Sequence, residues 1–83
     1  METKTTVLVV DDDPAIVDLL RDFLEMEGYG VATAGNGEEA LRLVEQESVG
    51  CMLLDVMMPA MSGFDLCRRI RETRDVPILF LSG

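Results

Sequence analysis

Short apolar runs alternate with amphipathic stretches along the chain, and this alternation restricts the possible folds more than any other feature. The runs at 5–10, 30–34, 50–55 and 76–83 are too short for helices, so each is predicted to be a buried strand. The stretches between them, at 14–27, 38–46 and 64–73, carry apolar residues at helical spacing. The order βαβαβαβ predicts an α/β fold with a parallel sheet, helices on both faces and right-handed crossovers.

The ends of the predicted helices carry their own signals. Asp13 is followed by proline, and this pair favours a helix start because Asp is a good N-cap and Pro fits the first helical position. Gly28 is predicted to end the first helix. In the last helix, we expect Phe64, Cys67 and Ile70 to face the core.

Composition limits the classes of function. The chain of 83 residues suits one small domain, and its net charge of -9 repels phosphate backbones and anionic lipids, so we expect no direct binding to nucleic acid or membranes. The absence of histidine and of any C-x-x-C pair excludes zinc fingers and Cys/His nucleophiles. Without an apolar run that could span a bilayer or a signal peptide, a cytoplasmic location is expected, with Cys51 and Cys67 reduced.

Acidic side chains stand where predicted strands end. Asp11 and Asp12 follow the first strand, Asp55 ends the third, and Ser82 lies at the same end of the fourth. If the first and third strands are neighbours, these side chains converge at the carboxyl edge of the sheet. Clustered oxygens suit a hard cation such as Mg²⁺, beside which an aspartate can act as a nucleophile in phosphoryl transfer. A serine hydroxyl can donate to a phosphoryl oxygen.

Other interpretations compete with this one. Carboxylates at strand ends are often merely solvated, although Asp55 interrupts an apolar run where Val or Leu would be the ordinary choice. An EF-hand loop is excluded because DDDPAI has no glycine at its sixth position. Two alternatives stay open: a fragment of a haloacid-dehalogenase-like phosphohydrolase with Asp11 as nucleophile, and a binding module that does not respond to Mg²⁺.

Three segments, VLVVDDDPAIVDLL, LLDVMMPAMSGFDLCRRIR and VPILFLSG, resemble the receiver domain of two-component response regulators. The resemblance runs the length of the chain and depends on the spacing from the acidic pair to Asp55, then to Pro59 and Gly63, and then to Ser82. It implies a flavodoxin-like sheet with strand order 2-1-3-4-5 in the complete family, of which 2-1-3-4 is expected here. It also implies phosphoryl transfer from a phosphohistidine of a sensor histidine kinase.

The resemblance assigns roles residue by residue. Asp55 matches the phosphoacceptor, and Ser82 matches the switch hydroxyl that contacts the phosphoryl group. The implied Mg²⁺ ligands are Asp12 directly, Asp11 through water, Asp55, and the backbone carbonyl of Met57. The module is not expected to be an enzyme, apart from assisting its own phosphorylation and dephosphorylation.

The family pattern continues beyond Gly83 with elements that supply a lysine and an aromatic switch residue. We therefore expect residues 1–83 to be the N-terminal part of a single receiver domain, truncated after the fourth strand, with impaired phosphorylation. The fourth strand would then form a sheet edge with free backbone groups, which favours self-association through this strand or domain swapping.

Overall fold

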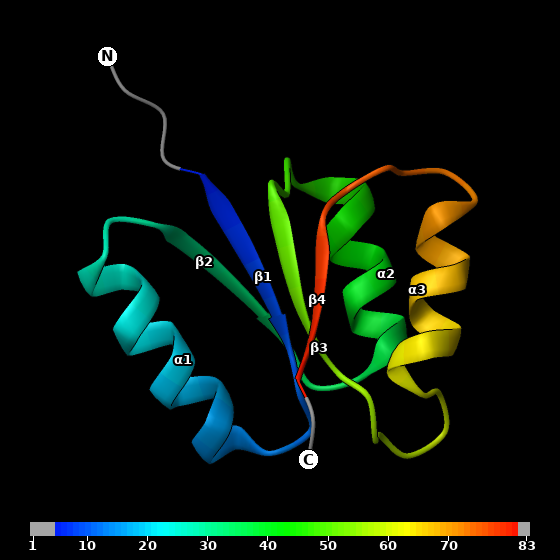
Figure 1. Cartoon of the computed structure of the whole chain (residues 1–83), viewed down its shortest axis with the longest axis horizontal. Coiled ribbons are helices and arrows are strands. Elements are labelled where there is room, and N and C mark those ends of the chain that lie inside the picture. Colours follow the sequence, from blue (N-terminus) through cyan, green and yellow to red (C-terminus); the bar gives the residue numbers. More distant parts are fainter. Residues whose placement is uncertain (1–4, 82–83) are drawn as a thin grey trace.

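Four parallel strands form one sheet, and three helices connect them (Figure 1). The computed structural model describes residues 5–81. The elements are β1 (Thr6–Val10), α1 (Pro14–Met26), β2 (Gly30–Ala34), α2 (Gly37–Gln46), β3 (Cys51–Asp55), α3 (Gly63–Arg71) and β4 (Ile78–Leu81). The strand order within the described residues is β2-β1-β3-β4. The predicted element order, parallel sheet and strand order are confirmed.

The helices cover both faces of the sheet, as predicted, with α1 on one side and α2 and α3 on the other (Figure 1). Because side chains of a strand alternate between faces, Leu8 and Val10 enter the larger core, and Val7 and Val9 enter the smaller core under α1. The buried residues that complete the larger core are Ala34, Ala40, Val44, Met52, Leu54, Leu66, Ile70 and Val76. The layers are therefore unequal: α1 supplies a single buried residue, Val17.

Side-chain caps set where each helix begins. The side chains of Asp13, Asn36 and Ser62 each accept a backbone N–H from the first turn of α1, α2 and α3, respectively. After α1, Gly28 takes a φ of +96°, which a glycine adopts without steric cost, and the chain turns toward β2. The predicted start and end of the first helix are confirmed to within one residue.

The prediction for the buried face of the last helix was wrong in one position. Phe64 is exposed, and its ring packs on Phe80 of β4 with a centroid distance of 4.9 Å. Leu66 and Ile70 enter the core instead, and Cys67 is half-buried. The stripe that faces the sheet runs from Gly63 through these two residues, and Phe64 lies about 100° to one side of it, toward the sheet edge.

The fourth strand begins later than predicted. Val76 and Pro77 lie outside β4, because proline has no N–H to donate to a strand ladder, although its carbonyl still accepts from Met52 N–H at 2.9 Å. Val76 is nevertheless buried. Among the described residues β4 pairs only with β3, so its position at a sheet edge is as predicted. In residues 5–81, none of the helices is long and apolar enough to cross a bilayer.

Candidate functional site

Three carboxylates meet at the carboxyl edge of the sheet. Asp11 follows β1 directly, held there by its N–H, which donates to the carbonyl of Ala34 at 3.2 Å, and Asp55 is the last residue of β3. Because β1 and β3 are neighbours, one oxygen each of Asp11, Asp12 and Asp55 lies within 4.8 Å of the others. The predicted convergence of these three residues is present in the structure.

The environment of Asp11 makes its negative charge costly. The residue is 7% exposed, and one of its carboxylate oxygens accepts the N–H of Asp13 at 2.9 Å. Burial raises the pKa of Asp11 above its ordinary value of 3.8, the hydrogen bond from Asp13 lowers it, and the charges of Asp55, Asp12 and Asp13 raise it further. The net shift of the pKa is upward, mainly through burial and further through the neighbouring carboxylates, and a cation bound at the cluster would favour the ionised form.

The donor set of this cluster fits a magnesium ion. Its three side chains offer only oxygen atoms, which hard divalent cations prefer over nitrogen and sulfur. Asp12 is exposed and Asp55 is half-buried, so the cluster remains open to solvent on one side, as an ion that keeps several waters requires.

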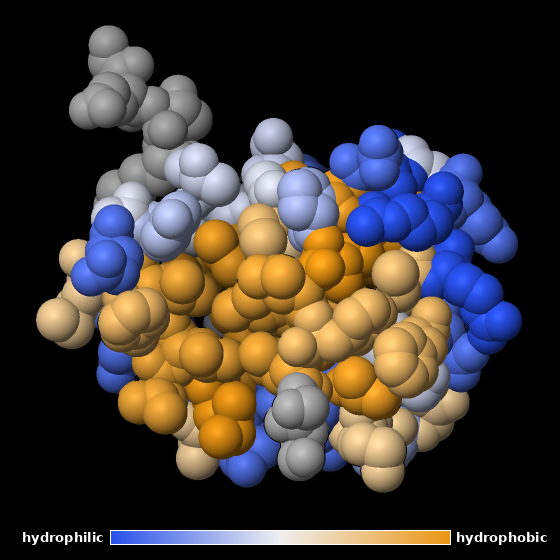
Figure 2. Space-filling view, in the orientation of Figure 1, coloured by the Kyte–Doolittle hydropathy of each residue, from blue (hydrophilic) through white to orange (hydrophobic). Residues whose placement is uncertain are grey.

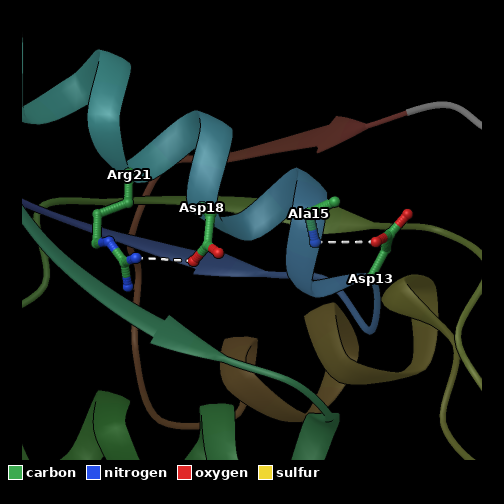
Figure 3. A network of polar contacts seen from close by, with 4 residues as sticks. All are labelled: Asp13, Ala15, Asp18 and Arg21. Carbon is green, nitrogen blue, oxygen red and sulfur yellow. Dashed lines mark hydrogen bonds and ion pairs between the residues drawn. The ribbon is translucent and has the colours of Figure 1, made fainter.

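Asp13, the third aspartate of the run, does not belong to this cluster. Its side chain accepts the N–H of Ala15 at 3.0 Å and caps α1 (Figure 3). One turn further along α1, Arg21 donates to Asp18 at 2.7 Å on the exposed side of the helix (Figure 3). The prediction that Asp13 serves as a helix cap is therefore confirmed.

The loop after β3 folds tightly against the end of that strand. The N–H of Met57 donates to one carboxylate oxygen of Asp55 at 3.2 Å, while the Met57 side chain is 75% exposed. Further on, the N–H of Gly63 donates to the carbonyl of Val56 at 3.0 Å. A Cβ at position 63 would lie 2.4 Å from the carbonyl oxygen of Asp55, so only glycine fits this approach. The structure thus gives Gly63 a role in positioning Asp55.

Between these residues, Ala60 has a φ of +70°, a conformation that costs energy for any residue with a Cβ. The sequence gives no sign of this positive φ, because alanine between Pro59 and Met61 is not a residue that favours it.

Several hollows border the carboxylates, and two of them matter for the site. One, which we call the carboxylate hollow, has a volume of about 570 Å³ and brings Asp11, Asp12 and Asp55 together with an apolar wall made of Ile16, Leu19, Leu20 and Leu81. The other, of about 440 Å³, lies between the loops that follow β2 and β3 and is also bordered by Asp12. The apolar wall was not predicted, because it forms only when α1 and the end of β4 come together. Ser82, which follows Leu81, lies outside the described residues.

Comparison with known proteins identifies the family. The sequence model of one protein family, described as the response regulator receiver domain, matches residues 7–83. The chain belongs to the response regulator receiver family. The match gives no support to the phosphohydrolase alternative, and the receiver family is not in itself a family of catalytic enzymes.

Individual relatives agree with this assignment. The probable transcriptional regulator ycf27 of Guillardia theta is 48% identical over 83 residues, which are 100% of this receiver chain and 33% of the relative. The chain therefore spans about a third of the length of the curated relatives that it matches.

Solved structures show the same fold. The response regulator TrrA of Thermotoga maritima, crystallised in complex with Mg²⁺-BeF, superimposes with a TM-score of 0.88 at 40% identity, covering 94% of this chain and 69% of TrrA. TrrA in complex with the histidine kinase ThkA gives a TM-score of 0.89 at 40% identity and covers 95% of this chain and 69% of the other. The expected flavodoxin-like receiver fold is thus confirmed.

Proposed function

We propose that Asp55 is the phosphoacceptor of this receiver domain and takes its phosphoryl group from a phosphohistidine of a sensor histidine kinase, with Mg²⁺ as cofactor. The observation that carries this proposal is the cluster of Asp11, Asp12 and Asp55, whose oxygens lie within 4.8 Å of one another at the carboxyl edge of the sheet. Two structures of one relative support it by similarity: TrrA was crystallised with Mg²⁺-BeF and, separately, with a histidine kinase.

The hydrogen bonds around Asp55 suit it to act as the nucleophile. The N–H of Met57 binds one carboxylate oxygen and orients the group, so the second oxygen is the one we assign to attack. That oxygen forms a bond to phosphorus while the bond from phosphorus to the histidine nitrogen breaks, and the electron pair of that bond stays on the imidazole. The product is an aspartyl phosphate on Asp55.

Asp11, Asp12, Asp55 and the backbone carbonyl of Met57 are the groups that we propose to hold Mg²⁺. When bound, the ion neutralises the carboxylates and the charge on the moving phosphoryl group. The raised pKa of Asp11 is consistent with this assignment, because burial first, and then the charges of Asp55, Asp12 and Asp13, make its ionised form costly, and a bound cation would offset that cost.

Ser82 is proposed as the hydroxyl that contacts the phosphoryl group. Support comes from β4, because Leu81 pairs in register with Asp55 and lines the carboxylate hollow. Beyond this chemistry, the domain at most assists its own phosphorylation and dephosphorylation.

Labelling with acetyl phosphate and Mg²⁺, followed by mass spectrometry of the intact chain, tests the acceptor. We expect one phosphoryl group on the wild-type chain and none on the Asp55→Asn variant. Asp13→Asn is the matched control, since it removes the same charge from the same edge of the sheet, keeps an N-cap side chain and leaves the cluster intact. Label that persists in Asp55→Asn and disappears in Asp11→Asn would refute the proposal in favour of phosphohydrolase chemistry.

An NMR titration tests the metal site directly, without any phosphoryl donor. We expect Mg²⁺ to shift the amide signals of residues 11, 12, 55 and 57 and to leave those of α2 unchanged. Shifts spread evenly over the acidic surface would mean that the ion is only a counterion, and the assigned ligands would then be wrong.

The remaining proposals concern the setting of the domain. We propose that the chain makes no direct contact with nucleic acid, because its net charge of -9 repels phosphates, although its Guillardia theta relative is named a transcriptional regulator. We also propose a cytoplasmic location, which the unpaired thiols of Cys51 and Cys67 support. That residues 1–83 are the N-terminal part of a single receiver domain stays a prediction.

A further inference from the structure

The loop between β3 and α3 contains a strained turn. We call residues 56–62 the acceptor loop, because they follow Asp55 directly. The N–H of Met61 donates to the carbonyl of Pro59 at 2.7 Å, which closes a γ-turn centred on Ala60. The φ of Ala60 is +70°, so this is the rare and strained form of the γ-turn. Such a turn persists only where neighbouring contacts hold it.

The side chains of the acceptor loop are almost entirely apolar. Its sequence is VMMPAMS, in which Ser62 is the single polar side chain, and Ser62 accepts the N–H of Asp65 at 3.1 Å to cap α3. Apolar surface reaches this loop at the lower right of Figure 2, below α3 in the view of Figure 1. Packing is therefore the means by which the side chains of this loop can hold its turn.

The side chain of Met61 packs against the backbone at the start of α2. A Cβ added to Gly37, the first residue of α2, would lie 2.6 Å from the Met61 sulfur and 3.3 Å from both its Cβ and its Cε. Met61 therefore occupies the space that a side chain at position 37 would need, and this contact requires a glycine. Met61 also packs against the larger core. These contacts fasten the strained turn to an element that follows a different strand.

The start of α2 is itself held in place. The N–H of Glu39 donates to the side chain of Asn36 at 2.9 Å, and the Glu39 side chain accepts the N–H of Gly35 at 2.9 Å. These bonds run in both directions across the first turn, much as in a capping box. The backbone at Gly37 is therefore a firm support for Met61.

The acceptor loop also contacts the carboxylate of Asp55. The N–H of Met57 donates to one of its oxygens at 3.2 Å, and the N–H of Gly63 donates to the carbonyl of Val56 at 3.0 Å. The second of these bonds fixes both ends of the loop at the end of β3. Because a closed loop cannot change at its turn without rotation elsewhere, relaxation of the turn would move the peptide group of Met57.

We propose that Met61 is a positioning residue for the phosphorylation of Asp55. By packing on Gly37 it holds the strained turn closed, and the closed turn keeps the N–H of Met57 on the Asp55 carboxylate. Met61 acts through the backbone of Met57 and not by contact with the phosphoryl donor. The positioning role rests on the proposed function of Asp55, whereas the mechanical link from Met61 to Met57 does not.

Labelling with acetyl phosphate and Mg²⁺ tests the effect on the reaction. We expect Met61→Ala to be labelled at least about tenfold more slowly than the wild type, because small misplacements of reacting groups cost large factors in rate. Met61→Leu should keep most of the rate, since leucine has a similar volume and fills the same space. Leu43→Ala is the matched control: it removes a partly buried side chain of the same core, on α2 and outside the loop, and should be labelled as the wild type is.

Hydrogen exchange of the Met57 amide, followed by NMR in the metal-free chain, tests the mechanical link without phosphorylation. We expect exchange at least about tenfold faster in Met61→Ala, and exchange close to that of the wild type in Met61→Leu and Leu43→Ala. The amides of β1 should stay protected in Met61→Ala. A merely structural role of Met61 would instead speed exchange in β1 together with that of Met57.

Circular dichroism verifies that each variant is folded. If Met61→Ala fails to fold, Gly37→Ala replaces it, because the new Cβ displaces the Met61 sulfur and leaves the acceptor loop unaltered in sequence. Unchanged exchange at Met57, or the same acceleration in Leu43→Ala, would overturn the mechanical link. Faster exchange with an unchanged labelling rate would overturn the positioning role. Absence of label on the wild-type chain contradicts the role of Asp55 instead, and the link is then judged from exchange alone.

Discussion

Replacement of Gly63 by alanine should destabilise the domain, although the residue opens a helix where alanine is normally favourable. The added Cβ would lie 2.4 Å from the carbonyl oxygen of Asp55 and 3.0 Å from the Cα of Val56. Both are backbone atoms at the end of a central strand, so we take the upper end of overpacking costs, about 3 kcal/mol. The higher helix propensity of alanine offsets about 1 kcal/mol of this cost, so the free energy of unfolding should fall by about 2 kcal/mol.

Urea unfolding followed by far-UV circular dichroism measures this loss, and a domain of this size should melt about 8–16 °C lower. Gly37→Ala is the matched control, because Gly37 also opens a helix but its Cβ would meet the Met61 sulfur at 2.6 Å, the flexible end of a side chain that can move. We expect a change within about 1 kcal/mol there. Equal stability changes in the two variants, or a Gly63→Ala chain as stable as the wild type, would refute the argument that the strand end leaves no space.

Three further predictions follow from the loops around the site. Ala60→Gly should stabilise the domain by about 0.5–1 kcal/mol in urea unfolding, because release of the left-handed strain exceeds the entropy lost by glycine, and destabilisation would contradict a φ of +70°. Asp13→Ala should cost about 1 kcal/mol through loss of the cap, and Asp13→Asn should cost much less if capping is the cause. The pKa of Asp11 is raised above 3.8 in the folded chain, so the folded chain binds the Asp11 proton more tightly than the unfolded chain does. The stability gained in this way is fully present below pH 3.8 and is lost as the pH rises through the raised pKa of the folded chain. Asp11→Asn should remove this loss and stabilise the metal-free domain at pH 7, and unfolding curves that show an unchanged pH dependence would disprove the assignment.

The placement of the site could be predicted from sequence because it depends on local patterns. Apolar runs that end on Asp11 and Asp55 define both strand direction and strand end, and a parallel sheet then brings these ends to one edge. Asp13 could be assigned as a cap because capping involves only the residues that follow it in the same turn.

Features that depend on contacts between distant elements could not be predicted. Phe64 fits a buried helical pattern as well as Leu66 does, and only the position of β4 decides that its ring packs against Phe80 at the edge. The apolar wall of the carboxylate hollow has the same origin, since Leu19 and Leu81 are far apart in the chain. The crowding between Gly63 and the Asp55 carbonyl likewise follows only from the tertiary arrangement.

The end of β4 is bonded directly to the end of β3, which carries Asp55. Asp55 is the register partner of Leu81, and the N–H of Val56 donates to the Leu81 carbonyl at 3.4 Å. If an ion at the carboxylates changes how the end of β4 is held, thermodynamic reciprocity requires that a partner that holds the end of β4 change the affinity for the ion by the same factor. Magnesium affinity then becomes a gauge of what contacts the end of β4.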